Sequence, residues 1–221
     1  MLNRISESVL ISAPDADIRH YEAIEGADLP KTSDFNLVIL TGGTWDLSKA
    51  VLDPWVAKVV DWVKDCVNFP DIRVIGLVGV TKSYREHLAA PSLFERAEHW
   101  SIAVENIPVT PRGREFFEGQ QALRLHKFHK RVVSVIPEGS QQLGVRAEIL
   151  ILDSNQILTF QGHLEMTAAI SQSFVEQGDT SYLTDLGPEG HARLRKSLEA
   201  AHNGDRTFAR ALSWAFEPLN K

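Results

Sequence analysis

A strand–helix–strand succession in the first third of the chain constrains the fold more than any other feature. Residues 35–43, FNLVILTGG, form a short apolar run that stops at two glycines, as expected of a buried strand followed by a tight turn. Residues 53–66 have apolar side chains at helical spacing, beginning with a suitable N-cap, Asp53, and with Pro54. A second β-branched run, residues 71–80, follows. This order and spacing predict a βαβ unit, and therefore a parallel sheet.

The rest of the chain continues the α/β pattern without a visible domain boundary. Shorter β-like runs lie at residues 101–110, 122–137 and 147–162. The last of them contains an Asp-Ser-Asn cluster that is typical of a hairpin turn. Helical patterns return at residues 164–177, 188–201 and 205–216. No repeat, low-complexity tract or linker interrupts the sequence, so we expect one α/β domain over residues 1–221.

Composition excludes several classes of protein. The chain has 221 residues, of which 43% are hydrophobic and 24% are charged, as in an ordinary globular protein. A net charge of -6 and a pI near 5.8 argue against nucleic-acid binding. No apolar run is long enough to span a membrane, and the N-terminus lacks the apolar stretch of a secretory signal. The single cysteine, Cys66, cannot form an internal disulfide, so a reducing, cytoplasmic location is expected.

The segment TFQGHLEM, residues 159–166, carries the strongest catalytic signal. Side chains two residues apart in an extended chain point to the same side, so His163 and Glu165 are predicted to lie side by side at the end of a strand. A carboxylate in that position orients an imidazole for base catalysis. Because such a base usually serves a nucleophile, the sequence should also contain one.

Six segments follow one another in a recognisable order from about residue 20 to residue 175. They are LTGG, DPWVAKVVDWVKD, RVIGLVGV, WSIAVENIPVTPRGREFF, LRLHKFHK and ILTFQGHLEM. Together they resemble the class I glutamine amidotransferase family, particularly its stand-alone fungal-type members. The resemblance implies a flavodoxin-like three-layer α/β/α sandwich with a mostly parallel sheet. It also implies that His163 and Glu165 are the catalytic base and its partner, and that the turn at Gly42 and Gly43 supplies part of an oxyanion hole.

The resemblance fails at the nucleophile. The chemistry of the family needs a cysteine thiolate on a strained turn after a strand. The corresponding run here is GLVGVTK, residues 76–82, with Val78 in the place of the cysteine. Valine has no nucleophilic atom, and a β-branched side chain suits unusual backbone angles poorly. Cys66 falls near the end of the preceding helix, where a buried structural role is expected. The sequence therefore predicts that glutaminase activity is absent.

The first strand of the family also has no counterpart. Residues 4–26 resemble the helix that follows that strand and then the second strand. A parallel sheet that lacks an inner strand leaves backbone groups unpaired. Three repairs are open: the N-terminal segment forms a strand, another chain fills the gap, or the sheet closes up. We favour a rearranged edge or dimerisation, so a homodimer or a partner chain that completes the sheet is a candidate assembly.

Several residues are candidates for binding a small-molecule ligand or substrate, namely Gly42, Gly43, Lys82, Ser83, His126 and His129. The glycines would present backbone N–H groups. Lys82 and Ser83 would act as nucleophiles, or would belong to the exposed start of a helix. The two histidines lie in a basic stretch suited to a carboxylate or phosphate. Metal binding would need a third ligand, for which His163 is the candidate, so we expect neither a metal nor another cofactor.

Two classes of function remain. In the first, the pocket is repurposed for acid/base chemistry on a small carbonyl-bearing metabolite, as a lyase, hydrolase or isomerase of specialised (secondary) metabolism. In the second, the chain is a pseudoenzyme that acts as a binding, regulatory or scaffold subunit. An open pocket around a hydrogen-bonded His163–Glu165 pair would favour the enzyme. Side chains of Val78 and Val80 filling that space would favour the pseudoenzyme.

Overall fold

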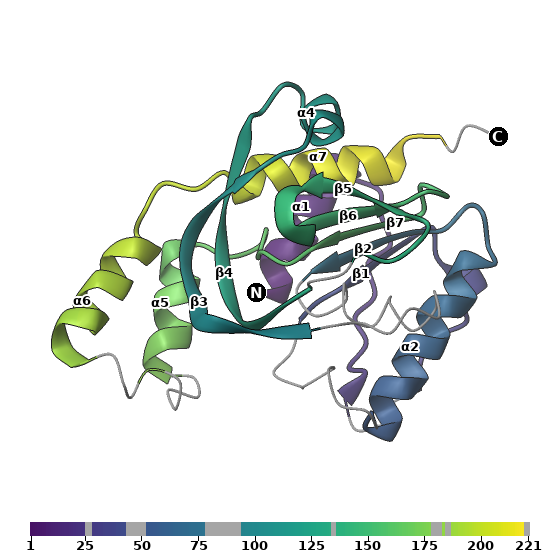
Figure 1. Cartoon of the computed structure of the whole chain (residues 1–221). Coiled ribbons are helices and arrows are strands. Elements are labelled where there is room, and N and C mark those ends of the chain that lie inside the picture. The colour runs from purple at the N-terminus through teal and green to yellow at the C-terminus, as the bar shows by residue number, and fades with distance from the viewer. Residues whose placement is uncertain are drawn as a thin grey trace.

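The main sheet is mixed, with a parallel half and an antiparallel half. The computed structural model describes residues 1–24, 28–42, 52–77, 94–133, 136–177, 183 and 187–218. Within them, five strands are ordered β1–β2–β7–β6–β5 (Figure 1). They are β1 (Leu37–Leu40), β2 (Arg73–Leu77), β5 (Ser140–Gly144), β6 (Ile149–Leu152) and β7 (Ile157–Phe160). β1, β2 and β7 run parallel, whereas β6 is antiparallel to both of its neighbours.

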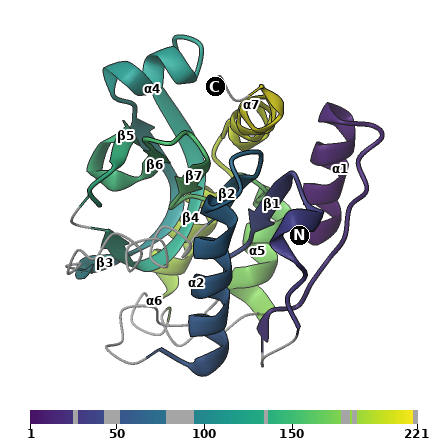
Figure 2. The same ribbon diagram turned by 90° about the vertical axis from the view of Figure 1, so that its right-hand side faces the viewer.

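Helices cover both faces of this sheet (Figure 2). The helices of the described residues are α1 (Leu2–Ser12), α2 (Pro54–Val67), α4 (Pro111–Phe116), α5 (Ala168–Gln177), α6 (Gly187–Leu198) and α7 (Gly204–Phe216), with 3₁₀ turns at Thr32–Asp34 and Val145–Ala147, and α1, α2 and α7 lie on the faces of the sheet. On one face, Val63 of α2 packs with Val74 of β2. On the other face, Ile75 of β2 joins the cluster that contains α1 and α7. Because successive strand residues face opposite helical layers, the three-layer α/β/α prediction is confirmed.

The predicted βαβ unit and hairpin are present. α2 begins at Pro54 after Asp53, which occupies the N-cap position without a side-chain capping bond. The hairpin between β6 and β7 turns at Asn155, whose φ of 60° is one that asparagine tolerates well. Residues 126–129 lie on a strand, so His126 and His129 do not share a helix face.

A long antiparallel ribbon extends from the main sheet. It consists of β3 (Phe94–Pro108) and β4 (Ala122–Val133), and it curves past the end of the sheet with α5 and α6 beside it (Figure 1). On the face toward the sheet, Leu123 and Leu125 enter the main core. On the opposite face, Ile102 and Phe128 pack against a cluster that includes Val175 of α5. The ribbon therefore separates the core from a second, smaller apolar layer.

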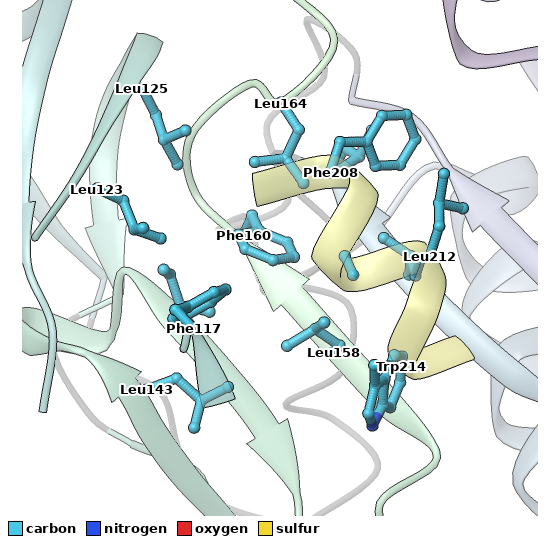
Figure 3. Packing of buried hydrophobic residues seen from close by; sticks show 14 of the residues in the cluster. Phe117, Leu123, Leu125, Leu143, Leu158, Phe160, Leu164, Phe208, Leu212 and Trp214 are labelled. Carbon is cyan, nitrogen blue, oxygen red and sulfur yellow. The ribbon is translucent and has the colours of Figure 1, made fainter. Parts of the chain in front are cut away.

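The core lies between the sheet, the ribbon and α7. Figure 3 shows Phe117 and Leu123 facing Phe160, with Phe208 and Leu212 of α7 on the other side. Leu164 is fully buried beside Phe208. Each large apolar side chain buried in this way contributes roughly 2–3 kcal/mol to folding. Because Phe160 and Leu164 both lie in this core, the packing fixes the start of the segment that follows β7.

The N-terminus differs from the expected pattern. The predicted helix is α1, but residues 16–23, where the second strand was expected, form no strand. Residues 16 and 18 instead pack their side chains against the core. Because β1 pairs directly with β2 and is the last strand of the sheet in the described part of the chain, no gap is left inside the sheet. Within the described strands, the sheet has therefore closed up. Assembly through the edge of β1 stays a prediction.

Candidate functional site

The three parallel strands end at one edge of the sheet. Leu40 of β1 pairs with Gly76, and Leu77 of β2 pairs with Phe160 of β7, so their carboxyl ends are aligned. Gly42 follows β1 at this edge and is half-buried, and His163 follows β7. In open α/β sheets, ligands bind outside the carboxyl ends of the strands. This carboxyl edge is therefore the candidate site.

Backbone contacts with β4 fix the segment that carries His163. Its amide N–H donates to the carbonyl oxygen of His126 at 2.8 Å, and the two residues form an isolated antiparallel bridge. Gly162 makes this approach possible, because a Cβ there would lie 2.9 Å from Cβ of Leu125. Leu164 points into the core on the opposite side. His163 and Glu165 consequently share the other side, as the sequence predicts.

The side chains of His163 and Glu165 form a hydrogen-bonded pair, or dyad. Nδ1 of His163 lies 2.8 Å from Oε1 of Glu165. An ionised carboxylate only accepts hydrogen bonds, so the proton of a neutral imidazole bonded to an ionised Glu165 lies on Nδ1. Nε2 is then the basic nitrogen that remains for a ligand. Glu165 is almost completely buried and His163 is 7% exposed. The ring of Phe128 packs edge-on against the imidazole at 6.1 Å between ring centroids.

His126 lies next to this dyad and is fully buried. Its Nδ1 is 2.9 Å from the hydroxyl of Ser171 on α5, and its ring meets His202 edge-on at 4.6 Å. Burial, followed by the neighbouring His202 and His163, lowers the pKa of His126 to about 4. The imidazole is therefore neutral at physiological pH. Ligand binding by His126, as the sequence suggests, stays a prediction, and its burial instead favours an action through neighbouring side chains.

A buried ion-pair network lies on the opposite face of β4. The ammonium group of Lys127 contacts Glu148 and lies 3.2 Å from Glu105, which also accepts a bond from Ser101. Burial raises the pKa of Glu148. Sequence reasoning missed Glu105 and Glu148, because their proximity depends on the register of β3 with β4 and on the path of the chain before β6. His129 is buried on the same strand.

The single cysteine lies at the other edge of the sheet. Cys66 is buried near the end of α2 in an apolar cluster with Ile72, Val74 and Ile157. These residues lie at or just before the amino ends of β2 and β7. About 10 Å of β7 separates that end from the carboxyl edge. Burial raises the pKa of the Cys66 thiol to about 12, so the thiolate is scarce at neutral pH. The predicted structural role of Cys66 agrees with this location.

Four predicted site residues lie outside the described part of the chain, namely Gly43, Val78, Lys82 and Ser83. Their assignments stay predictions, as does the filling of the pocket by Val78 and Val80. Within the described residues, no three His, Cys, Asp or Glu side chains are grouped so that they could hold a metal ion. No helix in the same residues has the length and apolarity required to cross a membrane.

The architecture is the fold of the glutamine amidotransferases. A glutamine amidotransferase from Thermotoga maritima superposes with a TM-score of 0.72 over 96% of this chain and 89% of that one, at 14% identity. Another from Methylobacillus flagellatus gives a TM-score of 0.68 over 95% of this chain and 88% of that one, at 17% identity. At such identities, this likeness concerns the fold.

Sequence comparison defines the family more narrowly. The glutamine amidotransferase-like protein chry6 of Gibberella zeae is 32% identical over 97% of this chain and 88% of its own length. The glutamine amidotransferase-like protein chyE of Penicillium rubens is 25% identical over 93% of this chain and 84% of its own. No protein-family model matches the chain. The chain belongs to the glutamine amidotransferase-like proteins.

Proposed function

We propose that this chain is a divergent glutamine amidotransferase-like protein without glutaminase activity, whose pocket performs acid/base chemistry on a small carbonyl-bearing metabolite. The observation that carries the proposal is the His163–Glu165 hydrogen bond of 2.8 Å at the carboxyl edge, combined with the location of the only cysteine at the opposite edge. A base is retained where the fold binds ligands, and no thiol accompanies it.

The loss of glutaminase activity follows from chemistry. Hydrolysis of an amide by this family passes through a covalent bond between substrate and a cysteine thiolate. Val78 occupies the corresponding place in the sequence, and Cys66 is protonated and packed among aliphatic side chains. His163 would therefore have no thiol from which to remove a proton. A base alone still provides roughly 10²–10⁴-fold acceleration of proton transfer.

A carbonyl-bearing substrate suits the remaining groups. Nε2 of His163 would take a proton from the carbon next to the carbonyl, and the electron pair would move onto the carbonyl oxygen as an enolate. Backbone N–H groups of the Gly42–Gly43 turn would stabilise that oxygen. Return of the proton to another carbon gives an isomerase, and loss of a leaving group gives a lyase. A role in specialised metabolism in the cytoplasm is part of this proposal, by resemblance to fungal-type relatives.

The alternative is a pseudoenzyme that binds or scaffolds. It is favoured by the low exposure of the His163 side chain, 9%, and by a sheet that ends at β1 in the described part of the chain. A homodimer or partner chain would then use that edge. The dyad would be retained because it stabilises the segment after β7. The two proposals differ in whether loss of the imidazole base alone removes the biological effect.

The first experiment measures ammonia release from glutamine by the purified protein. We expect no release above the rate without protein, and the same result for His163→Ala. Release that disappears in the His163→Ala variant would overturn the proposed loss of glutaminase activity. A glutaminase of known activity, assayed in parallel, confirms that the assay detects ammonia.

The second experiment compares metabolite profiles of a deletion strain complemented with wild type, His163→Ala or His20→Ala. His20 is exposed and bonds only Ser6 among the described contacts, so it is a matched control. For an enzyme, the deletion profile persists with His163→Ala and is corrected by His20→Ala. Full correction by a stable His163→Ala protein would support the pseudoenzyme instead.

A further inference from the structure

Three elements meet around the imidazole of His126. β4 carries the residue, Ser171 of α5 contacts its Nδ1, and His202, just before α7, contacts its ring. The loop before α7 is attached to the same strand, since the amide N–H of Asn203 donates to the carbonyl oxygen of Arg124 and the amide N–H of Arg124 donates to Oδ1 of Asn203. This anchoring holds the imidazole from two sides. It fixes the direction in which the other ring nitrogen points.

The bridge between β4 and the segment after β7 places this ring beside the dyad. Directly opposed residues in an antiparallel bridge project their side chains to the same side, about 5 Å apart. His126 is opposed to His163, and Glu165 shares the side of His163. His163 and Glu165 both influence the pKa of His126, the first lowering it and the second raising it. The three polar side chains form one buried group.

Two atoms of this group are buried without a hydrogen-bond partner among the described residues. They are Nε2 of His126 and Oε2 of Glu165. Leaving either of them unsatisfied would cost roughly 1–3 kcal/mol, and more for a charged oxygen. Buried polar atoms that do not touch are commonly joined by a water molecule.

The two atoms are also chemically complementary. The hydroxyl of Ser171 has a much better acceptor in Nδ1 of His126, at 2.9 Å, than in the sulfur of Met166, at 3.7 Å. When the hydroxyl donates to Nδ1, the proton of the neutral imidazole must be on Nε2. His126 then has a hydrogen-bond donor at Nε2, and Glu165 has an acceptor at Oε2.

We propose that His126 is a positioning residue for the His163–Glu165 pair, and that its Nε2–H group holds the second oxygen of Glu165 through one buried water molecule. This inference rests on the proposed function, in which His163 is the base. The resulting series of hydrogen bonds runs from Ser171 through His126, the water and Glu165 to His163. Each carboxylate oxygen then has a donor: His163 serves Oε1 and the water serves Oε2.

These linked hydrogen bonds keep His163 in the tautomer that has its proton on Nδ1, which leaves Nε2 as the basic nitrogen. A buried carboxylate that loses one of its donors is more readily neutralised by a proton. A neutral carboxyl group of Glu165 would donate to Nδ1 of His163, and the imidazole proton would then be on Nε2. That tautomer has no basic nitrogen for the substrate. His126 therefore controls the base without contacting the substrate.

The test is the tautomer of His163, measured by NMR on protein with ¹⁵N-labelled histidine. The chain has 8 histidines, and loss of one signal in His163→Gln assigns the resonance. We expect the Nδ1–H form in wild type and a majority of the Nε2–H form in His126→Phe. His126→Gln, which retains a donor and an acceptor, should restore the Nδ1–H form.

Ser171→Ala provides a second, gentler variant, because alanine suits a helix. It should also raise the Nε2–H fraction of His163, but by less than His126→Phe. Ser213→Ala on α7 is the matched control, since that hydroxyl bonds only a carbonyl of its own helix and should leave the tautomer unchanged. An unchanged tautomer of His163 in both folded His126→Phe and folded Ser171→Ala overturns the proposal.

A high-resolution crystal structure tests the water itself. A water within hydrogen-bond distance of both Nε2 of His126 and Oε2 of Glu165 supports the proposal, and a dry, unbridged pair overturns it. Neither measurement needs a substrate. If the protein catalyses nothing, His163→Ala would correct the deletion profile while the tautomer effect would still be observed, so the two proposals fail separately.

Discussion

Reactive side chains have different surroundings at the amino and carboxyl edges of the three parallel strands. At the amino edge, Cys66 lies among aliphatic side chains and burial raises its pKa to about 12. At the carboxyl edge, His163 and Glu165 lie within a polar group that extends to His126 and Ser171. Both places are buried, so burial alone does not distinguish inert from functional residues. The difference lies in whether buried polar atoms have polar neighbours.

This contrast is the reason why we propose the chemistry at the carboxyl edge. A thiol surrounded by aliphatic groups has nothing to stabilise its anion. An imidazole hydrogen-bonded to a carboxylate has both an orientation and a charge partner for its protonated form. The nucleophile and the base of a glutaminase must meet at the same edge, and in this chain the cysteine and the base are at different edges.

The largest expected effect concerns the side chain that anchors the dyad. Leu164→Ala should lower the free energy of unfolding by about 3 kcal/mol, because it removes a fully buried side chain from the core. It should also disturb the His163 tautomer, since Leu164 fixes which side of the chain the dyad occupies. Urea unfolding and ¹⁵N NMR measure the two effects.

Leu158→Ala is the control for that variant. Leu158 is equally buried in the same cluster but lies within β7, so it should cost a similar free energy and leave the tautomer unchanged. If both variants alter the tautomer equally, the carboxyl edge has no special anchor.

Local patterns in the sequence were sufficient for much of this architecture. Periodicity identified α2, β1 and β2, and the spacing of His163 and Glu165 identified the dyad. Contacts between distant segments were not predictable. Ser171 and His202 reach His126 only because α5 and the start of α7 fold back onto β4. The strand expected after α1 was wrong, since the resemblance supplied that strand and no local pattern in the sequence tested it, whereas the absence of a first strand and a closed-up sheet were among the outcomes left open.

The second expected effect is on the pH dependence of stability. His126 has a pKa of about 4 in the folded protein, against about 6.5 in an unfolded chain. The unfolded state therefore binds the proton first as the pH falls, and stability decreases between about pH 6.5 and pH 4. The full loss from this group is about 3 kcal/mol. Urea unfolding at several pH values should show that His126→Phe removes this part of the slope, whereas His20→Ala retains it.

A third, smaller effect comes from the close approach of β4 to the segment after β7. Gly162→Ala places a Cβ 2.9 Å from Cβ of Leu125, so the two backbones must separate. We expect a loss of about 2 kcal/mol. A crystal structure of the variant should show a lengthened bond between the amide of His163 and the carbonyl oxygen of His126. Unchanged stability together with an unchanged bond would mean that the approach is not a tight constraint.

The smallest expected effect is that of Cys66→Ala, which tests directly whether the amino edge is inert. Cys66→Ala should leave the biological effect in the complementation assay unchanged, because its thiol lies at the edge remote from His163, and should cost only about 1 kcal/mol of stability. In the native protein at pH 8, Cys66 should react with iodoacetamide on the order of 10³-fold more slowly than in urea, since burial raises its pKa to about 12 and leaves little thiolate. Rapid native alkylation that also abolishes the biological effect would place a working thiol near the dyad, and the distinction between an inert amino edge and a functional carboxyl edge would be wrong.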